Sequence, residues 1–274
     1  MRAILITGCS SGIGLDAART LAARGWRVFA TCRAEADCAR LRAEGLESFR
    51  LDYEAPETIA AAVAEVAERT GGRLDALFNN GAYAIPGALE DISPEALRAI
   101  FEANLIGWHA LTRGVIPLMR ANGGGRIVQC SSVLGFVGMK WRGAYVATKY
   151  ALEGLTDVLR LEMADAGIHV VLIQPGPIGT EFRRNAIRQF EAWVDWEASA
   201  RAEQYRTSLL KRLYKQKGPD RFELPPAAVT AALVRALEAR RPRPRYRVTV
   251  PTHAVAGLKR LLPDRWMDAL LGRG

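Results

Sequence analysis

Short apolar runs alternate along the first two thirds of the chain with segments in which apolar residues recur at helical spacing. The runs are rich in Ile, Val, Leu and Phe and are apolar on both faces. Strands need this character when helices cover both sides of a parallel sheet. We predict strands at residues 3–7, 26–32, 47–52, 74–80, 126–132 and 168–174.

The segments between these runs carry helix signals at their ends as well as helical spacing. Ser93 is a favourable N-cap, Pro94 suits the first helical position, and Gly167 would end the last of these helices. We predict helices at 14–25, 34–43, 56–70, 93–122 and 143–166. Strands and helices that alternate in this way form βαβ units. The pattern therefore predicts an α/β fold, a doubly wound parallel sheet of Rossmann type with helices on both faces.

The alternation is interrupted after residue 180, where a long segment has helical character and several aromatic side chains. A further helix, from 226 to about 240, then precedes a basic turn and a last strand. We expect one domain over residues 1–274. Its parts would be a core (1–180 and about 226–250), a helical insertion (181–225) and a C-terminal helical extension (251–274).

The composition is that of an ordinary globular protein, since 49% of the 274 residues are hydrophobic and 24% are charged. Cys9, Cys32, Cys38 and Cys130 lack CxxC spacing, and the three histidines form no HxxxH pattern. We therefore expect reduced thiols, a cytoplasmic location and no metal site. No apolar run approaches the roughly 20 residues that cross a bilayer, and the first residues predict a strand, not a signal peptide.

Positive charge is concentrated in the last third of the chain. Residues 1–180 hold 18 Lys and Arg against 19 Asp and Glu, whereas residues 181–274 hold 20 against 10. The net charge of +9 is therefore a property of the last third. A domain built wholly for nucleic acid would not show this division. We expect a local basic surface and no nucleic-acid partner.

A glycine-rich loop joins the first predicted strand to the first predicted helix. Its sequence is TGCSSGIG, from Thr7 to Gly14, with the spacing GxxxGxG. Glycine lets the backbone pass close to a pyrophosphate, and the N–H groups and dipole at a helix N-terminus favour anions. Alone, such a loop is only a tight turn, but its position between strand and helix predicts a dinucleotide site. The contacts would come from Gly8, Ser10, Ser11, Gly12, Ile13 and Gly14.

Tyr145 and Lys149 lie four residues apart in the sequence AYVATKY, on one face of a predicted helix. On a surface helix this pair would have no special role. A free tyrosine has a pKa of about 10 and transfers protons poorly at neutral pH. A lysine charge on the same face would favour the phenolate. Beside a redox cofactor, the pair would form a proton donor.

The GxxxGxG loop followed by YxxxK resembles the short-chain dehydrogenase/reductase family, and the resemblance spans about residues 2–180. The loop TGCSSGIG and the strand end VFATCR are most similar to the NADP-preferring, steroid- and retinoid-type branch. The resemblance implies four catalytic residues, Asn104, Ser132, Tyr145 and Lys149. Besides the loop, Tyr145 and Lys149, it implies cofactor contacts from Asp52, Asn80, Gly81, Pro175, Gly176, Ile178 and Thr180.

The resemblance also implies a mechanism. Tyr145 exchanges a proton with the substrate oxygen, and Ser132 hydrogen-bonds that oxygen. Lys149 lowers the phenol pKa and binds the nicotinamide ribose, while Asn104 holds a water that links Lys149 to solvent. Hydride passes between nicotinamide C4 and the carbonyl carbon. The chain has NNGA at 79–82 where the family usually has NNAG, which would move the conformationally free residue by one position.

The end of the second predicted strand bears on the choice between NAD and NADP. NAD enzymes place an acid there, which binds the ribose hydroxyls and repels a 2′-phosphate. Here Cys32 holds that position, and the following Arg33 would bind a phosphate bidentately. Ser11 lies where NADP-preferring members of the family often have a phosphate contact. We therefore expect NADP(H), with NAD(H) and a merely solvated Arg33 as the alternatives.

The helical insertion, by the same resemblance, covers the substrate. Aromatic and apolar side chains there and at 136–141 would line an apolar pocket for a lipophilic ketone, aldehyde or alcohol, sterol-like or retinoid-like. The alternative is that they only pack a helical subdomain. The residues concerned are Phe136, Val137, Met139, Trp141, Phe182, Phe190, Trp193, Trp196 and Tyr205. We expect a carbonyl reductase or alcohol dehydrogenase.

Three other functions compete with this one. A family member that epimerises or dehydrates its substrate would need a specialised site, which no motif signals. A catalytically silent, NADP-binding regulatory protein would typically have lost the tyrosine or the lysine. An adaptor that binds a membrane or nucleic acid through the basic C-terminal region would show salt-dependent binding without NADPH oxidation.

The tail, residues 252–274, has apolar residues at helical spacing, and Pro263 divides it into two short helices. We expect it to pack on its own subunit or on a partner. Peripheral contact with an acidic membrane surface is the alternative. The family resemblance implies a homodimer or homotetramer, assembled through the outer face of the helix that carries Tyr145 and Lys149.

Overall fold

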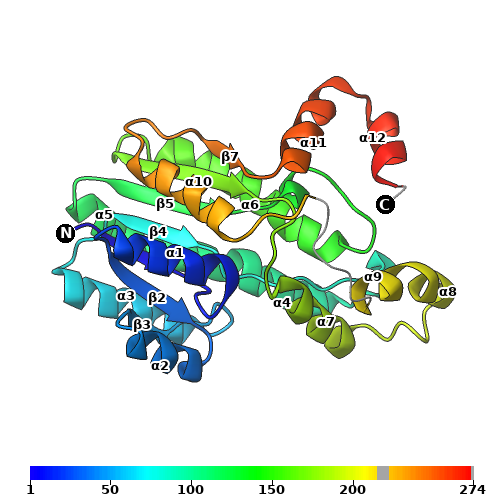
Figure 1. The fold of residues 1–274 in the computed structure, drawn as a ribbon, viewed down its shortest axis with the longest axis horizontal. Coiled ribbons are helices and arrows are strands. Elements are labelled where there is room, and N and C mark those ends of the chain that lie inside the picture. The colour runs from blue at the N-terminus through cyan, green and yellow to red at the C-terminus, as the bar shows by residue number, and fades with distance from the viewer. Residues whose placement is uncertain (215–221, 273–274) are drawn as a thin grey trace.

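The computed structural model describes residues 1–214 and 222–272. Within these residues seven strands form one parallel sheet in the order β3-β2-β1-β4-β5-β6-β7 (Figure 1). The strands are β1 (Ala3–Ile6), β2 (Arg27–Cys32), β3 (Glu47–Arg50), β4 (Ala76–Asn79), β5 (Gly125–Cys130), β6 (Ile168–Gln174) and β7 (Arg245–Arg247). The predicted α/β fold with a doubly wound parallel sheet is confirmed. Strand order reverses between β1 and β4, where such sheets open a crevice at their carboxyl ends.

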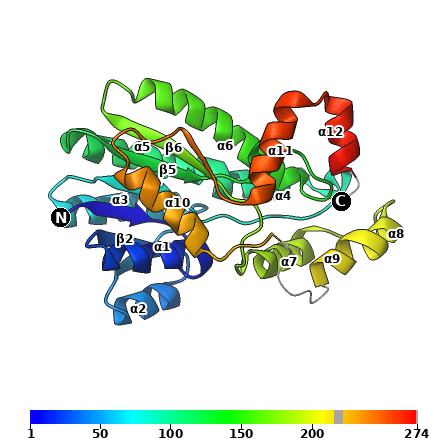
Figure 2. The same cartoon turned by 45° about the horizontal axis from the view of Figure 1, so that its top comes forward.

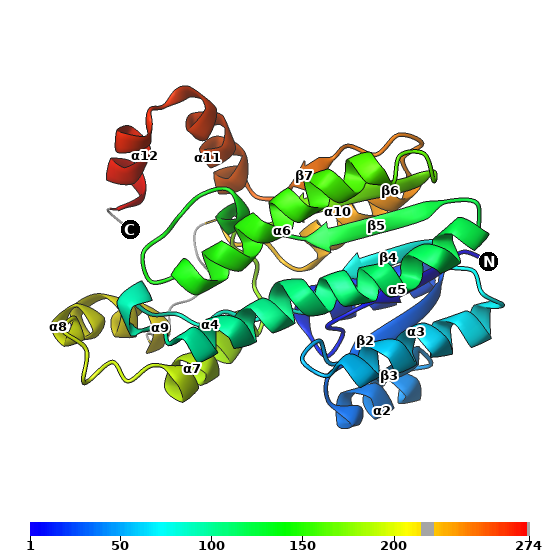
Figure 3. The ribbon, with the colours of Figure 1, turned by 180° about the vertical axis from the view of Figure 1, so that it is seen from behind.

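Helices cover both faces of this sheet. One face carries α1 (Gly12–Ala23) and α10 (Ala227–Glu238), which lie in front of the strands in Figure 1 and pack on each other. The other face, seen from behind in Figure 3, carries α3 (Pro56–Thr70), α5 (Gly107–Ala121) and α6 (Gly143–Glu162). The short helix α2 (Glu35–Ala43) packs beside β2 and β3 at the sheet's edge. Every residue of β1 and β4 is buried, because helices exclude water from both sides.

A polar network lies inside this apolar core. The Asn79 side chain, at the end of β4, accepts a hydrogen bond from the Tyr53 hydroxyl at 2.7 Å. Its amide nitrogen donates to Gln129 on β5 at 2.9 Å and to Thr112 on α5 at 3.1 Å. Buried polar groups are stable only when they are paired in this way. The network therefore fixes the end of β4 relative to β5 and α5.

The predicted helix at 93–122 is continuous but not uniform. Ser93 caps it as expected, accepting a hydrogen bond from the Ala96 N–H at 3.1 Å. After α4 (Pro94–Phe101), however, the chain widens into a π-helical turn, Glu102–Ile106, before α5 begins. Such a turn holds one residue more than an α-turn and often occurs at functional sites. Asn104, a predicted site residue, lies within it.

The insertion after β6 folds into α7 (Phe182–Trp193), α8 (Ala202–Gln204), the π-helical turn Tyr205–Leu209 and α9 (Leu210–Tyr214). Residues 215–221 of the predicted insertion lie outside the described residues. The Tyr205 ring is fully buried, 4.8 Å from the Trp141 ring centroid and 6.0 Å from that of Phe190. Its hydroxyl donates to Asp91 at 2.7 Å. This segment thus has its own apolar cluster beside the sheet's core.

The C-terminal region agrees with the prediction in its strand and in its helices. The predicted last strand is confirmed as β7, which has three residues, and α11 (Val250–Leu261) begins shortly after it. The predicted break at Pro263 is confirmed, and α12 (Asp264–Leu271) follows it. Figure 2 shows this helix pair standing at the end of the molecule where the insertion also lies.

The two faces of the helix pair differ in their contacts. Met267 is buried in the apolar cluster of the insertion, and Leu258 packs against that cluster. The opposite face leaves Leu261 and Trp266 exposed, Trp266 by 68%. The inner face of the tail therefore packs on its own subunit. None of the helices in the described residues is both long and apolar enough to span a bilayer.

An arginine on β7 ties this edge strand to α6. Arg245 donates to the Glu153 carboxylate at 3.0 Å and to that of Asp157 at 2.7 Å. Glu153 is only 7% exposed and also accepts a hydrogen bond from Gln174 at 2.9 Å. Removal of the cation from a buried ion pair strongly destabilises the folded protein, because the carboxylate stays buried without a partner.

We predict that Arg245→Ala lowers the free energy of unfolding by about 3 kcal/mol, since it leaves the Glu153 carboxylate buried without its cation. The matched control is Arg98→Ala, because Arg98 and Glu95 form an exposed pair on α4 that contributes less than about 1 kcal/mol. Urea unfolding followed by circular dichroism measures both losses. Equal, small losses would mean that the Arg245 pair contributes no more than a surface contact.

Candidate active site

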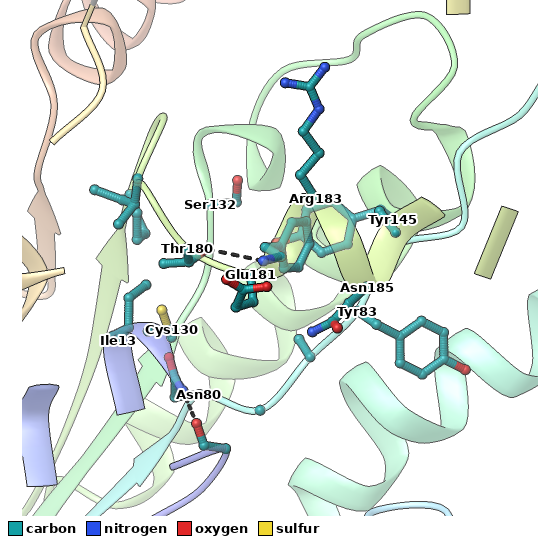
Figure 4. Close-up of a pocket in the computed structure, with 18 of the residues that line it drawn as sticks. Ile13, Asn80, Tyr83, Cys130, Ser132, Tyr145, Thr180, Glu181, Arg183 and Asn185 are labelled. Atoms are coloured by element: carbon teal, nitrogen blue, oxygen red, sulfur yellow. Dashed lines mark hydrogen bonds between the residues drawn. The ribbon is translucent and has the colours of Figure 1, made fainter. Parts of the chain in front are cut away.

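A cavity of about 1040 Å³ opens at the carboxyl ends of the central strands. It runs from Arg33 and Asp52 at one end to α7 and α9 at the other. Figure 4 shows side chains from the glycine loop, the ends of β4 and β5, α6 and α7 around one space. Of the predicted site residues, all line this cavity except Gly14 and Asn104.

The glycine loop is packed too closely for side chains. A Cβ atom on Gly8 would lie 2.7 Å from the Gly81 Cα, and one on Gly14 would lie 2.3 Å from the Gly8 oxygen. Gly8 and Gly12 also have φ angles of 69° and 55°, which favour glycine. Ser11 begins α1 without a capping hydrogen bond from its side chain. The N–H groups of the first turn of α1 are therefore available to an anion.

The NNGA segment does not use the conformational freedom of its glycine. Gly81 does not have a positive φ, so the prediction that the conformationally free residue moves by one position is wrong. A Cβ atom on Gly81 would meet its nearest neighbours at 3.4 Å, an ordinary contact, and it is the Gly81 backbone that forms the wall against which Gly8 packs. The Gly81 N–H donates to the Thr7 hydroxyl at 3.2 Å, and its carbonyl accepts from the Trp108 indole at 2.9 Å.

Tyr145 and Lys149 are both buried, one helical turn apart on α6. The Lys149 ammonium, only 1% exposed, donates to the Cys130 carbonyl at 2.9 Å. It lies 4.3 Å from the Trp108 ring centroid and 5.6 Å from that of Tyr145. The cation thus stands between the end of β5 and two aromatic rings.

Burial dominates the titration of this pair. It raises the pKa of the Tyr145 phenol, although hydrogen bonding to Ser132 and the charge of Arg142 act in the opposite direction. Burial also lowers the pKa of Lys149 to about 8. Both shifts follow because a water-poor site disfavours phenolate and ammonium alike. The expected lowering of the Tyr145 pKa by Lys149 is not seen in this structure, where the groups that lower it are Ser132 and Arg142.

Ser132 and Asn104 have different relations to the cavity. Ser132 follows β5 and faces the cavity, and its hydroxyl accepts a hydrogen bond from the Leu134 N–H at 3.1 Å. Asn104 lies one layer behind, fully buried. Its side chain accepts from the Tyr83 N–H at 3.1 Å, and donates to the Tyr83 carbonyl at 2.8 Å and the Thr148 hydroxyl at 3.3 Å. The structure thus brings Ser132, Tyr145 and Lys149 together, with Asn104 supporting the neighbouring loop.

The loop after β6 closes the cavity from the other side. Its predicted contacts are Pro175, Gly176, Ile178 and Thr180, and all four line the cavity. Leu224 pairs with this loop, accepting from the Gly179 N–H at 3.0 Å and donating to the Pro177 carbonyl at 3.2 Å. The Thr180 hydroxyl accepts from the Phe182 N–H at 3.3 Å (Figure 4). These bonds hold the loop between the sheet and α7.

At the opposite end, Arg33 and Asp52 line the cavity while Cys32 is buried beneath them. Burial raises the pKa of the Cys32 thiol to about 12, so it adds no negative charge at neutral pH. Arg40 on α2 supports the glycine loop by donating to the Ser10 carbonyl at 2.7 Å. No acid occupies the strand end at which NAD enzymes bind ribose hydroxyls.

The sequence patterns did not identify several residues that contribute to this site. The Thr7 hydroxyl accepts a hydrogen bond from the Asn80 N–H at 2.9 Å and shares another with the Tyr53 hydroxyl at 2.8 Å. Trp108, Arg40 and Tyr53 were also not expected. Trp108 lies one turn after Asn104. A buried tryptophan needs a partner for its N–H, and this requirement was the available sign that Trp108 contacts the site. In the described residues, no group of three or more His, Cys, Asp or Glu side chains is placed to hold a metal ion.

The substrate end of the cavity is only partly apolar. Met139 and Phe182 line it as predicted, and the Phe182 ring meets the Tyr145 ring edge-on at 5.4 Å. The prediction is wrong for the other aromatic and apolar residues, which lie outside the cavity wall and mostly pack the insertion. These are Phe136, Val137, Trp141, Phe190, Trp193, Trp196 and Tyr205. The alternative, that they pack a helical subdomain, describes most of them.

Known proteins resemble this chain in sequence. The sequence model of the short chain dehydrogenase family matches residues 2–191. The uncharacterized oxidoreductase YbbO of Escherichia coli K12 is 40% identical over 98% of this chain and 94% of its own. Mouse retinol dehydrogenase 16 is 33% identical over 98% and 87%. Human 17-beta-hydroxysteroid dehydrogenase type 1 is 34% identical over 70% and 61%.

Solved structures agree with these sequence matches. A short-chain dehydrogenase from Streptomyces avermitilis superposes with a TM-score of 0.78 at 29% identity, covering 100% of this chain and 97% of its own. A short-chain dehydrogenase/reductase from Burkholderia phymatum in complex with NAD superposes with a TM-score of 0.77 at 26% identity, covering 100% and 95%. The chain therefore belongs to the short-chain dehydrogenase/reductase family of oxidoreductases.

Proposed function

We propose that this protein is an NADP(H)-dependent oxidoreductase that transfers a hydride between the nicotinamide and a carbonyl or alcohol substrate. The observation that carries the proposal is the meeting of Ser132, Tyr145 and Lys149 where the two halves of the cavity join. The glycine loop fits a dinucleotide, because Gly8, Ser11 and Gly12 line the cavity at the N-terminus of α1, where N–H groups favour phosphate. When bound, the coenzyme supplies or accepts the hydride.

Side chains of the protein would supply proton transfer, charge stabilisation and positioning. The Tyr145 phenol gives a proton to the substrate oxygen in reduction and takes it back in oxidation. The Ser132 hydroxyl hydrogen-bonds that oxygen as negative charge develops on it. The Lys149 ammonium holds the ribose of the coenzyme and opposes the effect of burial on Tyr145. Asn104 positions the loop through Tyr83, and an ordered water beside it would connect Lys149 to solvent.

The preference for NADP(H) follows from charge at the far end of the cavity. Arg33 is exposed there, and no carboxylate stands at the end of β2 to repel a 2′-phosphate. Ser11 lines the same space. Family membership alone does not decide for NADP(H), since the Burkholderia phymatum structure holds NAD. The local electrostatics of this chain favour the phosphorylated one.

For the substrate we propose a lipophilic ketone, aldehyde or alcohol, sterol-like or retinoid-like in size. The names of the steroid and retinol dehydrogenases among the relatives support this class. Leu134, Met139, Phe182 and Leu213 form an apolar wall near Tyr145 that would receive such a molecule. A catalytically silent protein would have no need to keep Ser132, Tyr145 and Lys149 together at one cavity.

For the setting of the reaction we propose a homodimer or homotetramer in the cytoplasm. All four cysteines are buried, free thiols, which suits a reducing compartment. The outer face of α6 exposes Val158 and Leu161, as an interface through that helix requires. Peripheral contact with a membrane through Leu261 and Trp266 is the alternative use of the tail's outer face.

We predict that Tyr145→Phe lowers turnover by about 100-fold or more, because it removes the acid–base group. Binding of NADPH, followed by fluorescence titration, should stay nearly unchanged, since only one hydroxyl is lost. Tyr150→Phe is the matched control, because the Tyr150 hydroxyl lies on the same helix outside the cavity and accepts a hydrogen bond from Lys259 at 3.2 Å. Turnover that survives in Tyr145→Phe would contradict the mechanism.

We predict that Arg33→Ala raises the Michaelis constant for NADPH about tenfold, the effect of losing one charge-assisted phosphate contact. The constant for NADH should change little, because NADH lacks the 2′-phosphate. Arg50→Ala serves as the control, since Arg50 lies beside Arg33 without lining the cavity. Initial rates with both coenzymes give the comparison. Equal effects on NADPH and NADH would remove the argument for coenzyme preference.

A further inference from the structure

The outer half of the cavity has an apolar zone and a basic zone. Near Tyr145 its wall is formed by apolar side chains. Farther out, α7 and α9 contribute a set of basic side chains to the same wall. The basic set is Arg183, Arg188, Lys211 and Arg212. A pocket for a wholly lipophilic molecule would gain nothing from four cations at its mouth.

In the part of the chain that the structure describes, three members of this set have no acidic partner. Glu181 lines the cavity but already pairs with Arg184 at 2.8 Å. The other acid of this wall, Glu223, lies against Gly179 of the loop after β6. Within residues 1–214 and 222–272, no carboxylate forms an ion pair with Arg188, Lys211 or Arg212. Among the described residues, Arg188, Lys211 and Arg212 therefore bring positive charge to the mouth of the cavity that no carboxylate pairs, beside neutral Asn185 and Gln189.

We propose that the preferred substrate is an amphiphile, with an apolar segment that carries the carbonyl or alcohol and an anionic group, carboxylate or phosphate, at its other end. This inference rests on the proposed function. The apolar segment would lie along Leu134, Met139 and Phe182. The anionic group would meet the guanidinium and ammonium groups at the mouth, which bind carboxylate and phosphate oxygens well. A cleft lined by one sign of charge also concentrates such substrates from solution.

The test compares substrates that differ only at the far end. NADPH oxidation is measured with a long-chain ω-oxo carboxylic acid, its methyl ester and an ω-oxo alkyl phosphate of equal length. We expect kcat/KM for the acid or the phosphate to exceed that for the ester by about tenfold, the value of one charge-assisted contact. The ratio should shrink as sodium chloride is added, because salt screens exposed charges. Comparison of the two anionic arms shows which head group is preferred.

Charge-neutralising variants locate the effect. Arg188→Gln and Arg212→Gln should each reduce the ratio of anionic to ester substrate. Arg206→Gln is the control, because Arg206 lies in the same insertion over the Trp196 ring and does not line the cavity. An ester used as well as the acid would overturn the inference while leaving the proposed function intact. So would variants that raise the Michaelis constant for NADPH without changing the ratio. Failure of every carbonyl compound would overturn the proposed function itself.

A second inference concerns Trp108, which the family motifs do not include. Its ring is 0% exposed, its indole N–H donates to the Gly81 carbonyl at 2.9 Å, and its face lies 4.3 Å from the Lys149 ammonium. One side chain thus contacts both the coenzyme half of the cavity and the predicted catalytic cation. We infer that Trp108 is a positioning residue that keeps Lys149 charged and in place through its ring face.

The surroundings of Lys149 explain why a ring face matters. The charged or titratable groups that face it are the Cys130 thiol on β5, and Tyr145 and Glu153 on α6. Burial nevertheless lowers the pKa of Lys149 to about 8, so this pKa lies only a little above neutral pH and the ammonium loses its proton readily. A cation–π contact is strongest in such a desolvated place. Loss of the ring would therefore lower the pKa further.

The test uses Trp108→Phe and Trp108→Leu, which both lose the indole N–H but differ in the ring face. The readout is kcat/KM for NADPH against pH. The protonated lysine is lost as pH rises through its pKa, so a lower pKa moves the alkaline limb to lower pH. We expect a shift of about one unit for Leu, as a lost cation–π contact of ~1–2 kcal/mol implies, and a smaller one for Phe. If the alkaline limb of the pH profile is the same in both variants and in the parent protein, Trp108 has only a packing role.

Discussion

The ammonium of Lys149 is buried at the carboxyl end of β5, and holding a positive charge there constrains most of what surrounds it. An unpaired charge in such a place would cost several kcal/mol of folding free energy, or the group would become neutral. The Cys130 carbonyl and the Trp108 ring offset part of that cost. Because these partners belong to β5 and α5 while Lys149 belongs to α6, the charge joins the sheet to two helices where the cavity opens.

The π-helical turn before α5 serves the same region. Its extra residue brings the Asn104 side chain against the backbone of Tyr83, where it makes two hydrogen bonds, and against Thr148, the neighbour of Lys149. One turn later, Trp108 holds Gly81 in the loop after β4. A single widened helix therefore fixes both the loop after β4 and the helix that carries Tyr145 and Lys149.

The parts of the fold that could be predicted are those that depend on local pattern. Six of the strands, the Ser93 cap and the break at Pro263 follow from apolar runs and from residues with strong backbone preferences. The π-helical turn could not be predicted, because Asn104 acts on a segment 21 residues earlier and leaves the helical spacing of its own segment unchanged. The role of Gly81 was missed for a related reason. The Gly81 backbone matters because it lies against Gly8, and a single sequence does not show which segments of the chain lie against each other.

The two halves of the cavity differ in how strongly physics constrains their residues. At the coenzyme end, a Cβ on Gly8 or Gly14 would collide with backbone atoms, so few sequences are compatible with the shape. A sequence motif can therefore identify this end. At the substrate end, exposed side chains such as Arg188 and Arg212 line the wall, and many alternatives would fold equally well. Specificity therefore resides in residues that the fold does not dictate, and the charge of those residues is the direct physical guide to what they bind.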